Sequence, residues 1–226
     1  MKSIEVKGIT AEELGEDHIA TSADTPLRKD AFKLSDEEKI ERIEEHFRGI
    51  MEALGLDLED ESLQGTPGRV ARMYVNEIFH GLDPERRPNA RKFSNKYNYS
   101  EMLVEKNIRV SSFCEHHFLP FVGKAHVGYI SSGNVIGLSK INRIVNYYSR
   151  RPQVQERLTL QIANELERVL ESEDVAVYIE SHHFCVSLRG IQDVASSTVT
   201  SEYRGAFRED KVQRQFIQSI IAETEM

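Results

Sequence analysis

The segment FCEHHFLP, residues 113–120, places side chains that bind metals and transfer protons inside an otherwise apolar stretch. Cys114 and His117 have the C-x-x-H spacing with which one tight loop supplies two zinc ligands. The second cysteine, Cys185, lies in SHHFCVSLRG, where alternation along an extended strand puts His183 on the same face. If the two segments pair, Cys114, His117 and Cys185 converge on one ion and leave a fourth position for water, as in a catalytic zinc site.

Each of these residues alone has an ordinary explanation. A lone cysteine is usually a small buried hydrophobe, and a lone histidine is usually a hydrogen-bonded core or surface residue. The chain has only two cysteines, both lie within three residues of a histidine, and four of its eight histidines fall in these two segments. This concentration favours bound zinc, with a structural zinc or a redox disulfide as the alternatives.

A second group of residues is suited to anions. The segment GLSKINRIV sets Lys140 and Arg143 three residues apart behind a predicted Ser139 helix cap, and free N–H groups at a helix start favour phosphate. Arg189 shares the predicted strand face of Cys185. A metal-bound water beside these cations predicts hydrolysis of a phosphorylated substrate; the alternative is that Lys140 and Arg143 are solvated charges on a helix surface.

The segment RRPQVQERLT adds Gln155 and Glu156 at the start of a further predicted helix. A carboxylate there can accept paired N–H bonds from the edge of a nucleobase. Simple charge complementarity with the helix N-terminus is an equal alternative for Glu156.

The elements that must position these residues follow from hydrophobic periodicity. A capping box of Ser35 and Glu38 begins a helix that stops at Gly55, and Thr66 is predicted to cap a second helix that ends at Gly81. The predicted order then becomes strand, strand, helix, helix, strand, strand and a last helix, with strands at 102–113, 121–130, 174–190 and 197–207, helices at 139–150 and 154–170, and the last helix from about 209.

This order predicts an α+β fold, an antiparallel sheet with two helices on one face. We expect an N-terminal extension over 1–34, a helical annex over 35–95 and a catalytic domain over 96–226. The 226 residues carry a formal charge of −8, which gives no general attraction for nucleic acid or anionic membranes, and the sequence lacks a signal peptide and a long apolar run. We therefore expect a cytoplasmic protein with no nucleic-acid or membrane partner.

Three segments resemble the signature sequences of GTP cyclohydrolase I: FCEHHFLPFVGKAHVGYI, GLSKINRIVNYYSRRPQVQERLTLQIA and HHFCVSLRG. The resemblance covers roughly Thr66 to Phe207. It implies the tunnelling fold, in which the sheets of several subunits close into a barrel, and a decamer of two face-to-face pentamers. It also implies conversion of GTP and water to 7,8-dihydroneopterin triphosphate and formate, the first step of tetrahydrofolate and pterin biosynthesis.

The resemblance assigns roles position by position. It implies Zn²⁺ as the cofactor and GTP as the substrate. His116 and His183 match acid-base residues. Gln155 is expected in the catalytic group and, together with Glu156, matches the residues that hold the guanine. The implied metal ligands are Cys114, His117 and Cys185, and the implied sugar-triphosphate residues are Ser139, Lys140, Arg143, Arg189 and Arg69.

Three other functions are conceivable for a chain with these cysteines and histidines. The H-x-E and P-C-x-x-C pattern of nucleobase deaminases is absent from the sequence. A tunnelling-fold reductase with a cysteine nucleophile would not need His117 and both cysteines together. The alternative from another class is a non-enzymatic oligomer that is stabilised by zinc or responds to redox conditions.

Overall fold

The structure is a computed structural model that describes residues 22–222. Residues 1–21, which form most of the predicted N-terminal extension, lie outside the described residues. Within the described range, no helix combines the length and the apolar character needed to cross a bilayer.

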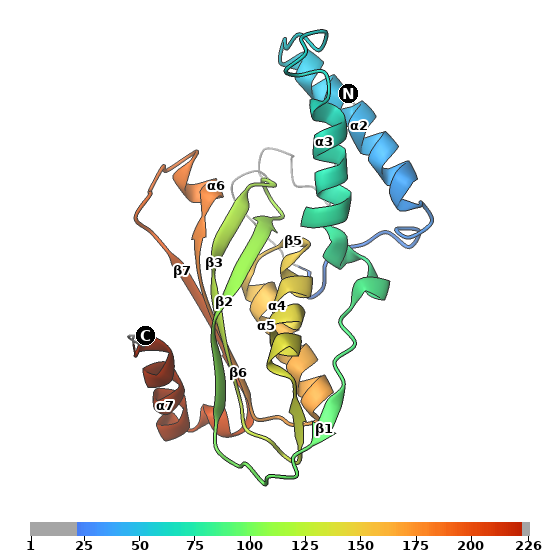
Figure 1. The fold of residues 1–226 in the computed structure, drawn as a ribbon. Helices are drawn as coiled ribbons and strands as arrows, with labels where there is room; N and C mark the ends of the chain where they lie inside the picture. The colour runs from blue at the N-terminus through green and yellow to red at the C-terminus, as the bar shows by residue number, and fades with distance from the viewer. Residues whose placement is uncertain (1–21, 223–226) are drawn as a thin grey trace, which may run out of the picture.

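A curled five-stranded sheet forms the centre of the molecule (Figure 1). The strands lie in the order β5-β2-β3-β6-β7, and all neighbours are antiparallel except β2 and β5. The predicted long hairpin is confirmed, because β2 and β3 pair along their length and the Cys-His segment joins them. The bounds are β2 (Leu103–Cys114), β3 (Pro120–Tyr129), β5 (Pro152–Gln153), β6 (Val175–His183) and β7 (Thr198–Tyr203).

Two helices cover one face of this sheet, as predicted: α4 (Leu138–Ser149) and α5 (Gln155–Leu170) (Figure 1). Their apolar stripes meet the inward-facing residues of β2, β3 and β6 in one buried core. Its members include Ile141, Ile144, Leu158, Ile162 and Leu166 from the helices, and Val110, Phe121, Val127 and Ile179 from the strands. The fold is therefore the mixed α+β arrangement that the order of elements predicts.

The opposite face is partly covered by the C-terminal elements, η4 (Gly205–Arg208) and α7 (Asp210–Ile221). Phe207 and Phe216 are fully buried and form a second apolar cluster. Gly128 on β3 makes this contact possible, because a Cβ there would lie 2.9 Å from the Phe216 ring. The predicted last helix is confirmed.

The N-terminal helices pack against each other and stand away from the sheet (Figure 1). The capping box of Ser35 and Glu38 begins α2 (Asp36–Ala53), as predicted, and Gly55 follows with a φ of 79°. The second predicted helix is interrupted: α3 (Thr66–Met73) continues as a π-helix, η1 (Tyr74–Ile78), and then as short 3₁₀ turns, η2 (His80–Leu82) and η3 (Pro84–Arg86). Thr66 is not the cap, because Gly65 occupies that position and Thr66 lies in the first turn.

Gly81 joins the N-terminal helices to the sheet domain. Its N–H donates to the carbonyl of Arg150 at 2.8 Å, and the Arg151 guanidinium donates to the Gly81 carbonyl at 2.5 Å. A Cβ at Gly81 would lie 2.1 Å from the carbonyl oxygen of Tyr147, so this close approach requires glycine.

Two further expectations about local structure are wrong, in addition to the Thr66 cap. Ser139 does not cap α4, because Gly137 is the N-cap and Ser139 lies inside the first turn. The strand with Cys185 ends at His183, and Phe184–Ser187 form a short helix, α6. His183, Cys185 and Arg189 therefore do not share one strand face, and the apolar run FCV could not reveal this because its pattern suits either structure.

A small ribbon was missed from the sequence: β1 (Lys92–Ser94) pairs with β4 (Asn134–Ile136). Three-residue strands are too short to show a period of two. The approach to β1 is fixed by Arg87, which forms an ion pair with Glu165 on α5, and Arg168 binds the same carboxylate. The Glu165 side chain is 0% exposed.

We expect Glu165→Gln to lower the free energy of unfolding by about 3 kcal/mol at pH 7, because two guanidinium groups lose a buried partner. Burial alone would raise the pKa of Glu165, but the hydrogen bonds and charges of Arg168 and Arg87 outweigh it and hold the pKa below 4.5. A lowered pKa stabilises the fold above the unfolded pKa, and this stability is lost as pH falls through the folded pKa. Denaturant titration at pH 7 and in acid should show the variant's deficit shrinking in acid. The exposed Glu173→Gln is the control, and an equal change in both variants would contradict the prediction.

Candidate active site

Three predicted metal ligands meet at one edge of the sheet. The ligand atoms of Cys114, His117 and Cys185 all lie within 4.8 Å of one another. Cys114 ends β2 and is 7% exposed, and Cys185 lies in α6 directly after β6. The convergence predicted from the two sequence segments is thus present, although Cys185 reaches it from a helical turn instead of a strand.

A tight turn presents the first two of these residues. Phe118 donates its N–H to the Cys114 carbonyl at 2.9 Å, and Cys114 donates its own N–H to the Leu119 carbonyl at 2.8 Å. Phe118 has a φ of 52°, a left-handed conformation that is costly for a bulky residue. This left-handed residue closes the turn that carries His117.

The chemistry of the donors fits a divalent soft or borderline metal. Burial first, and then the adjacent Cys114, together raise the pKa of the Cys185 thiol to about 11. Two crowded thiols, one buried and one half-buried, resist ionisation unless a cation compensates both negative charges. Two thiolates and an imidazole are a ligand set that zinc prefers.

His183 lies beside this group in a fixed orientation. Its ring stacks on Phe121 with centroids 4.6 Å apart and planes 10° apart, and its Nε2 is 2.8 Å from Oε1 of Gln155. Gln155 is 1% exposed and donates its amide to the carbonyls of Ile179 and Thr198. Because the amide oxygen accepts, the hydrogen bond fixes a proton on Nε2 of His183. Burial lowers the pKa of His183, and the Glu156 carboxylate acts in the opposite direction.

The remaining residues of the Cys-His segment are also held in place. Nδ1 of His116 lies 3.6 Å from Sγ of Cys114. Glu115 accepts two hydrogen bonds from the Arg157 guanidinium, at 2.6 and 3.0 Å, and Arg157 is 3% exposed. This bidentate pair ties the segment to the first turn of α5, next to Gln155 and Glu156.

The predicted phosphate-binding residues are divided between different places. Arg189 lies at the metal group, where its Nη1 is 2.7 Å from Nε2 of His117. Arg69 is on α3, away from the sheet, and binds Thr66 at 2.7 Å (Figure 1). Three others, Ser139, Lys140 and Arg143, lie on the first turns of α4.

The start of α4 is at the far end of the sheet from the metal group. Asn142 donates to Glu105 near the beginning of β2 at 2.9 Å, whereas Cys114 ends the same strand. Nine residues of strand span roughly 30 Å. A single chain therefore does not bring Ser139, Lys140 and Arg143 to its own metal group.

Comparison with known proteins decides the family. The GTP cyclohydrolase I family model matches residues 43–221. The chain belongs to the GTP cyclohydrolase I family. It is 56% identical over 214 residues to GTP cyclohydrolase 1 of Flavobacterium johnsoniae, covering 95% of this chain and 96% of that protein.

More distant relatives carry the same name. GTP cyclohydrolase 1 of Aeromonas salmonicida is 51% identical over 189 residues, covering 84% of this chain and 86% of that protein. The Vibrio parahaemolyticus protein is 51% identical over 191 residues, covering 84% and 87%. The matched range of the GTP cyclohydrolase I model includes every predicted site residue, from Arg69 to Arg189.

Sequence reasoning gave no role to Glu115 and Arg157, although both stand inside the GTP cyclohydrolase I signature segments. They are 42 residues apart, so spacing alone could not pair them. It also missed Phe121 under His183, because stacking depends on the register between β3 and β6.

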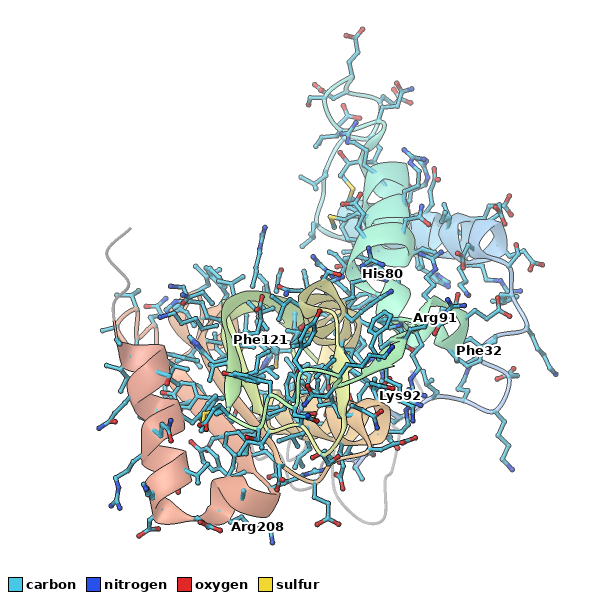
Figure 2. All side chains as sticks on the ribbon, turned by 60° about the horizontal axis from the view of Figure 1, so that its bottom comes forward. Phe32, His80, Arg91, Lys92, Phe121 and Arg208 are labelled. Atoms are coloured by element: carbon cyan, nitrogen blue, oxygen red, sulfur yellow. The ribbon has the colours of Figure 1, made fainter. Side chains whose placement is uncertain are left out.

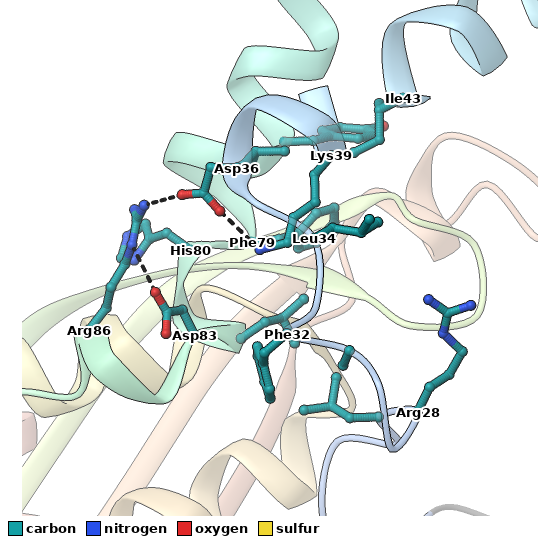
Figure 3. A pocket seen from close by; sticks show the side chains of 15 residues that line it. Arg28, Phe32, Leu34, Asp36, Lys39, Ile43, Phe79, His80, Asp83 and Arg86 are labelled. Carbon is teal, nitrogen blue, oxygen red and sulfur yellow. Dashed lines mark hydrogen bonds and ion pairs between the residues drawn. The ribbon is translucent and has the colours of Figure 1, made fainter. Parts of the chain in front are cut away.

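A separate cavity of about 270 Å³ lies between residues 27–34, α2 and η1, and its lining is mostly apolar (Figure 3). Asp36 binds Lys39 and Arg86 at its edge, and Asp83 binds Arg86 (Figure 3). None of the predicted site residues lines this cavity. Its neutralised charges give no indication of a phosphorylated ligand.

We expect Glu115→Gln to lower zinc affinity about 10- to 100-fold, because loss of the charge frees the Cys-His segment from the buried Arg157. Zinc would be titrated against a competing chelator with both proteins at equal concentration. Glu101→Gln removes an exposed carboxylate and should leave the affinity unchanged. Equal zinc affinity in Glu115→Gln and the wild type would mean that the pair does not position the ligands.

Proposed function

We propose that the protein is a zinc-dependent hydrolase that converts GTP and water to 7,8-dihydroneopterin triphosphate and formate. The observation that carries the proposal is the convergence of Cys114, His117 and Cys185 beside His183 in a GTP cyclohydrolase I chain. The names of the relatives give GTP as the substrate. Opening the imidazole ring of guanine then sets the demands on the site.

The zinc would be held by Cys114, His117 and Cys185. Zinc bound there supplies an activated water near neutral pH for addition to C8 of guanine, a weak electrophile. The chain's own contribution to that position is a ligand group of one buried and two half-buried side chains, whose loop is held by the Glu115–Arg157 pair.

His183 is proposed as the residue that moves the proton to N7 of guanine as the ring opens. Its lowered pKa keeps the imidazole neutral at pH 7, so it can take up one proton and pass on one. Because Nε2 of His183 is hydrogen-bonded to Gln155, the proton transfer is assigned to its other ring nitrogen, Nδ1. Gln155 thus positions His183, while His116 is the second proposed acid-base residue.

Glu156 is proposed to hold the guanine base. It is the exposed residue of the first turn of α5, directly between Gln155 and Arg157, and its carboxylate can accept two N–H bonds from the edge of guanine. The side-chain amide of Gln155 already donates to the carbonyls of Ile179 and Thr198. Recognition of the base is therefore assigned to Glu156.

The triphosphate is proposed to bind Ser139, Lys140, Arg143, Arg189 and Arg69, with the α4 residues supplied by another copy of the chain. The roughly 30 Å between the start of α4 and the metal group exceeds the length of GTP, so one copy cannot hold both ends. A barrel of several subunits, the tunnelling fold, brings the two ends of neighbouring sheets together. We propose the decamer of two pentamers on the same basis.

We propose the division of the chain that the order of its elements predicts. Residues 96–226 form the proposed catalytic domain, 35–95 the helical annex and 1–34 the extension. The ribbon of β1 and β4 links the annex segment to the catalytic domain.

The proposal is tested by incubating zinc-loaded protein with GTP and measuring formate and oxidised, fluorescent pterin. We expect the wild type to release both. His183→Ala should retain zinc and slow formate release by roughly two to four orders of magnitude, the usual size of an acid-base contribution.

His182→Ala is the matched control, since His182 hydrogen-bonds Ser187 and the carbonyl of Ser196 and is neither a proposed metal ligand nor a proposed acid-base residue. Wild-type protein that retains zinc but releases no formate would reject the enzyme in favour of a zinc-stabilised oligomer. Normal formate release by His183→Ala would remove that residue from the mechanism, and loss of zinc would identify it as a ligand.

A further inference from the structure

A cavity of about 510 Å³ lies between the start of α4 and the chain that leads into β1. One wall carries Ser139 and Lys140, which the proposed function assigns to the triphosphate. The other wall carries Asn89, Arg91 and Phe93, to which neither the sequence nor the proposed function gives a role.

Strand register places Arg91 opposite the start of α4. Lys92 pairs with Ile136, so Arg91, one residue earlier, faces Gly137, the N-cap of α4. Alternation along the strand sends Arg91 and Phe93 to one side and Lys92 to the other. Lys92 binds Glu171, whereas Arg91 lines the cavity (Figure 2 labels both residues).

The charges of this cavity are not neutralised within the chain. Among the described residues, neither the Arg91 guanidinium nor the Lys140 ammonium makes a hydrogen bond or ion pair. No carboxylate lines the cavity within the described part of the chain, although the protein as a whole has a formal charge of −8. Two cations that face one space without a partner attract an anion, and a guanidinium binds phosphate in a bidentate manner.

We propose that Arg91 is a further substrate-binding residue that holds the phosphates furthest from the base. This rests on the proposed function, since the base must reach the metal group and only the far end of the phosphate chain then enters this cavity. The roles of Arg91 and Lys140 are complementary: Lys140 supplies a point charge from α4, and Arg91 closes the cavity from the β1 side with a planar fork.

The test uses inorganic triphosphate as the probe, titrated by calorimetry into the full-length protein, together with steady-state kinetics on GTP. Arg91→Ala should weaken triphosphate binding about 10- to 100-fold and raise KM for GTP by a similar factor. The value of kcat should change less than about threefold, because the reacting ring is bound elsewhere. Inhibition by GMP, which lacks the outer phosphates, should be nearly unchanged, and Arg91→Lys should restore part of the loss.

Lys96→Ala is the matched control, because it removes an exposed cation from the same region that does not line the cavity. Triphosphate binding that is weakened equally by Lys96→Ala and Arg91→Ala, or unchanged in Arg91→Ala, would overturn the inference. Equal losses for GMP and GTP would also overturn it. If Lys140→Ala weakens triphosphate binding while Arg91→Ala does not, the role of Arg91 is wrong and the proposed function is unaffected. If the wild-type protein does not open GTP, the proposed function is wrong, and the triphosphate titration still tests Arg91 separately.

Discussion

The register of β3 is the constraint on which the metal group depends. Cys114 ends β2 and Cys185 follows β6, and these two strands do not pair with each other because β3 lies between them. Phe113 pairs with Pro120 and Phe121 pairs with His183, so the C-terminal ends of β2 and β6 lie at the same edge of the sheet. A slip of one residue would turn the inward residues of β3 to the other face and separate the two thiols. The same register places Phe121 opposite His183, and the stacking of the two rings orients this proposed proton-transfer residue.

The first turn of α5 connects this edge to the interior. Three successive residues of this turn have different surroundings. Gln155 hydrogen-bonds His183, Glu156 is exposed, and Arg157 binds Glu115 in the Cys-His segment. The helix is anchored by the core, in which Leu158 and Ile162 are fully buried. The packing of α5 against the core thus fixes the positions of three groups: the Cys-His segment, the His183 imidazole and the Glu156 carboxylate proposed to bind guanine. Preorganisation of this kind limits the rearrangement needed when the substrate binds.

Sequence patterns predicted the long elements well, because β2, β3, α4, α5 and α7 each show a clear hydrophobic period. They also predicted which residues form the metal group, since cysteine and histidine are rare enough for their clustering to carry information. The strand expected through Cys185 was wrong, because a four-residue helix such as α6 has too few turns to impose a period. The Glu115–Arg157 pair, the β1–β4 ribbon and the facing of Arg91 to α4 could not be predicted, since each depends on how distant segments meet in three dimensions. The sequence likewise contains no local sign that Lys140 lies far from its own chain's metal group.

That separation is the central feature of the proposed enzyme: each chain offers a metal half at one end of its sheet and a phosphate half at the other. The most direct test is to co-assemble two inactive variants, His183→Ala and Lys140→Ala, and to measure formate release from GTP. Sites shared between copies predict that mixed oligomers regain about a quarter of wild-type activity, because random mixing places both intact halves at one site in that fraction of cases. Activity of the mixed oligomers no greater than that of the two variants assayed separately would contradict a site built between subunits.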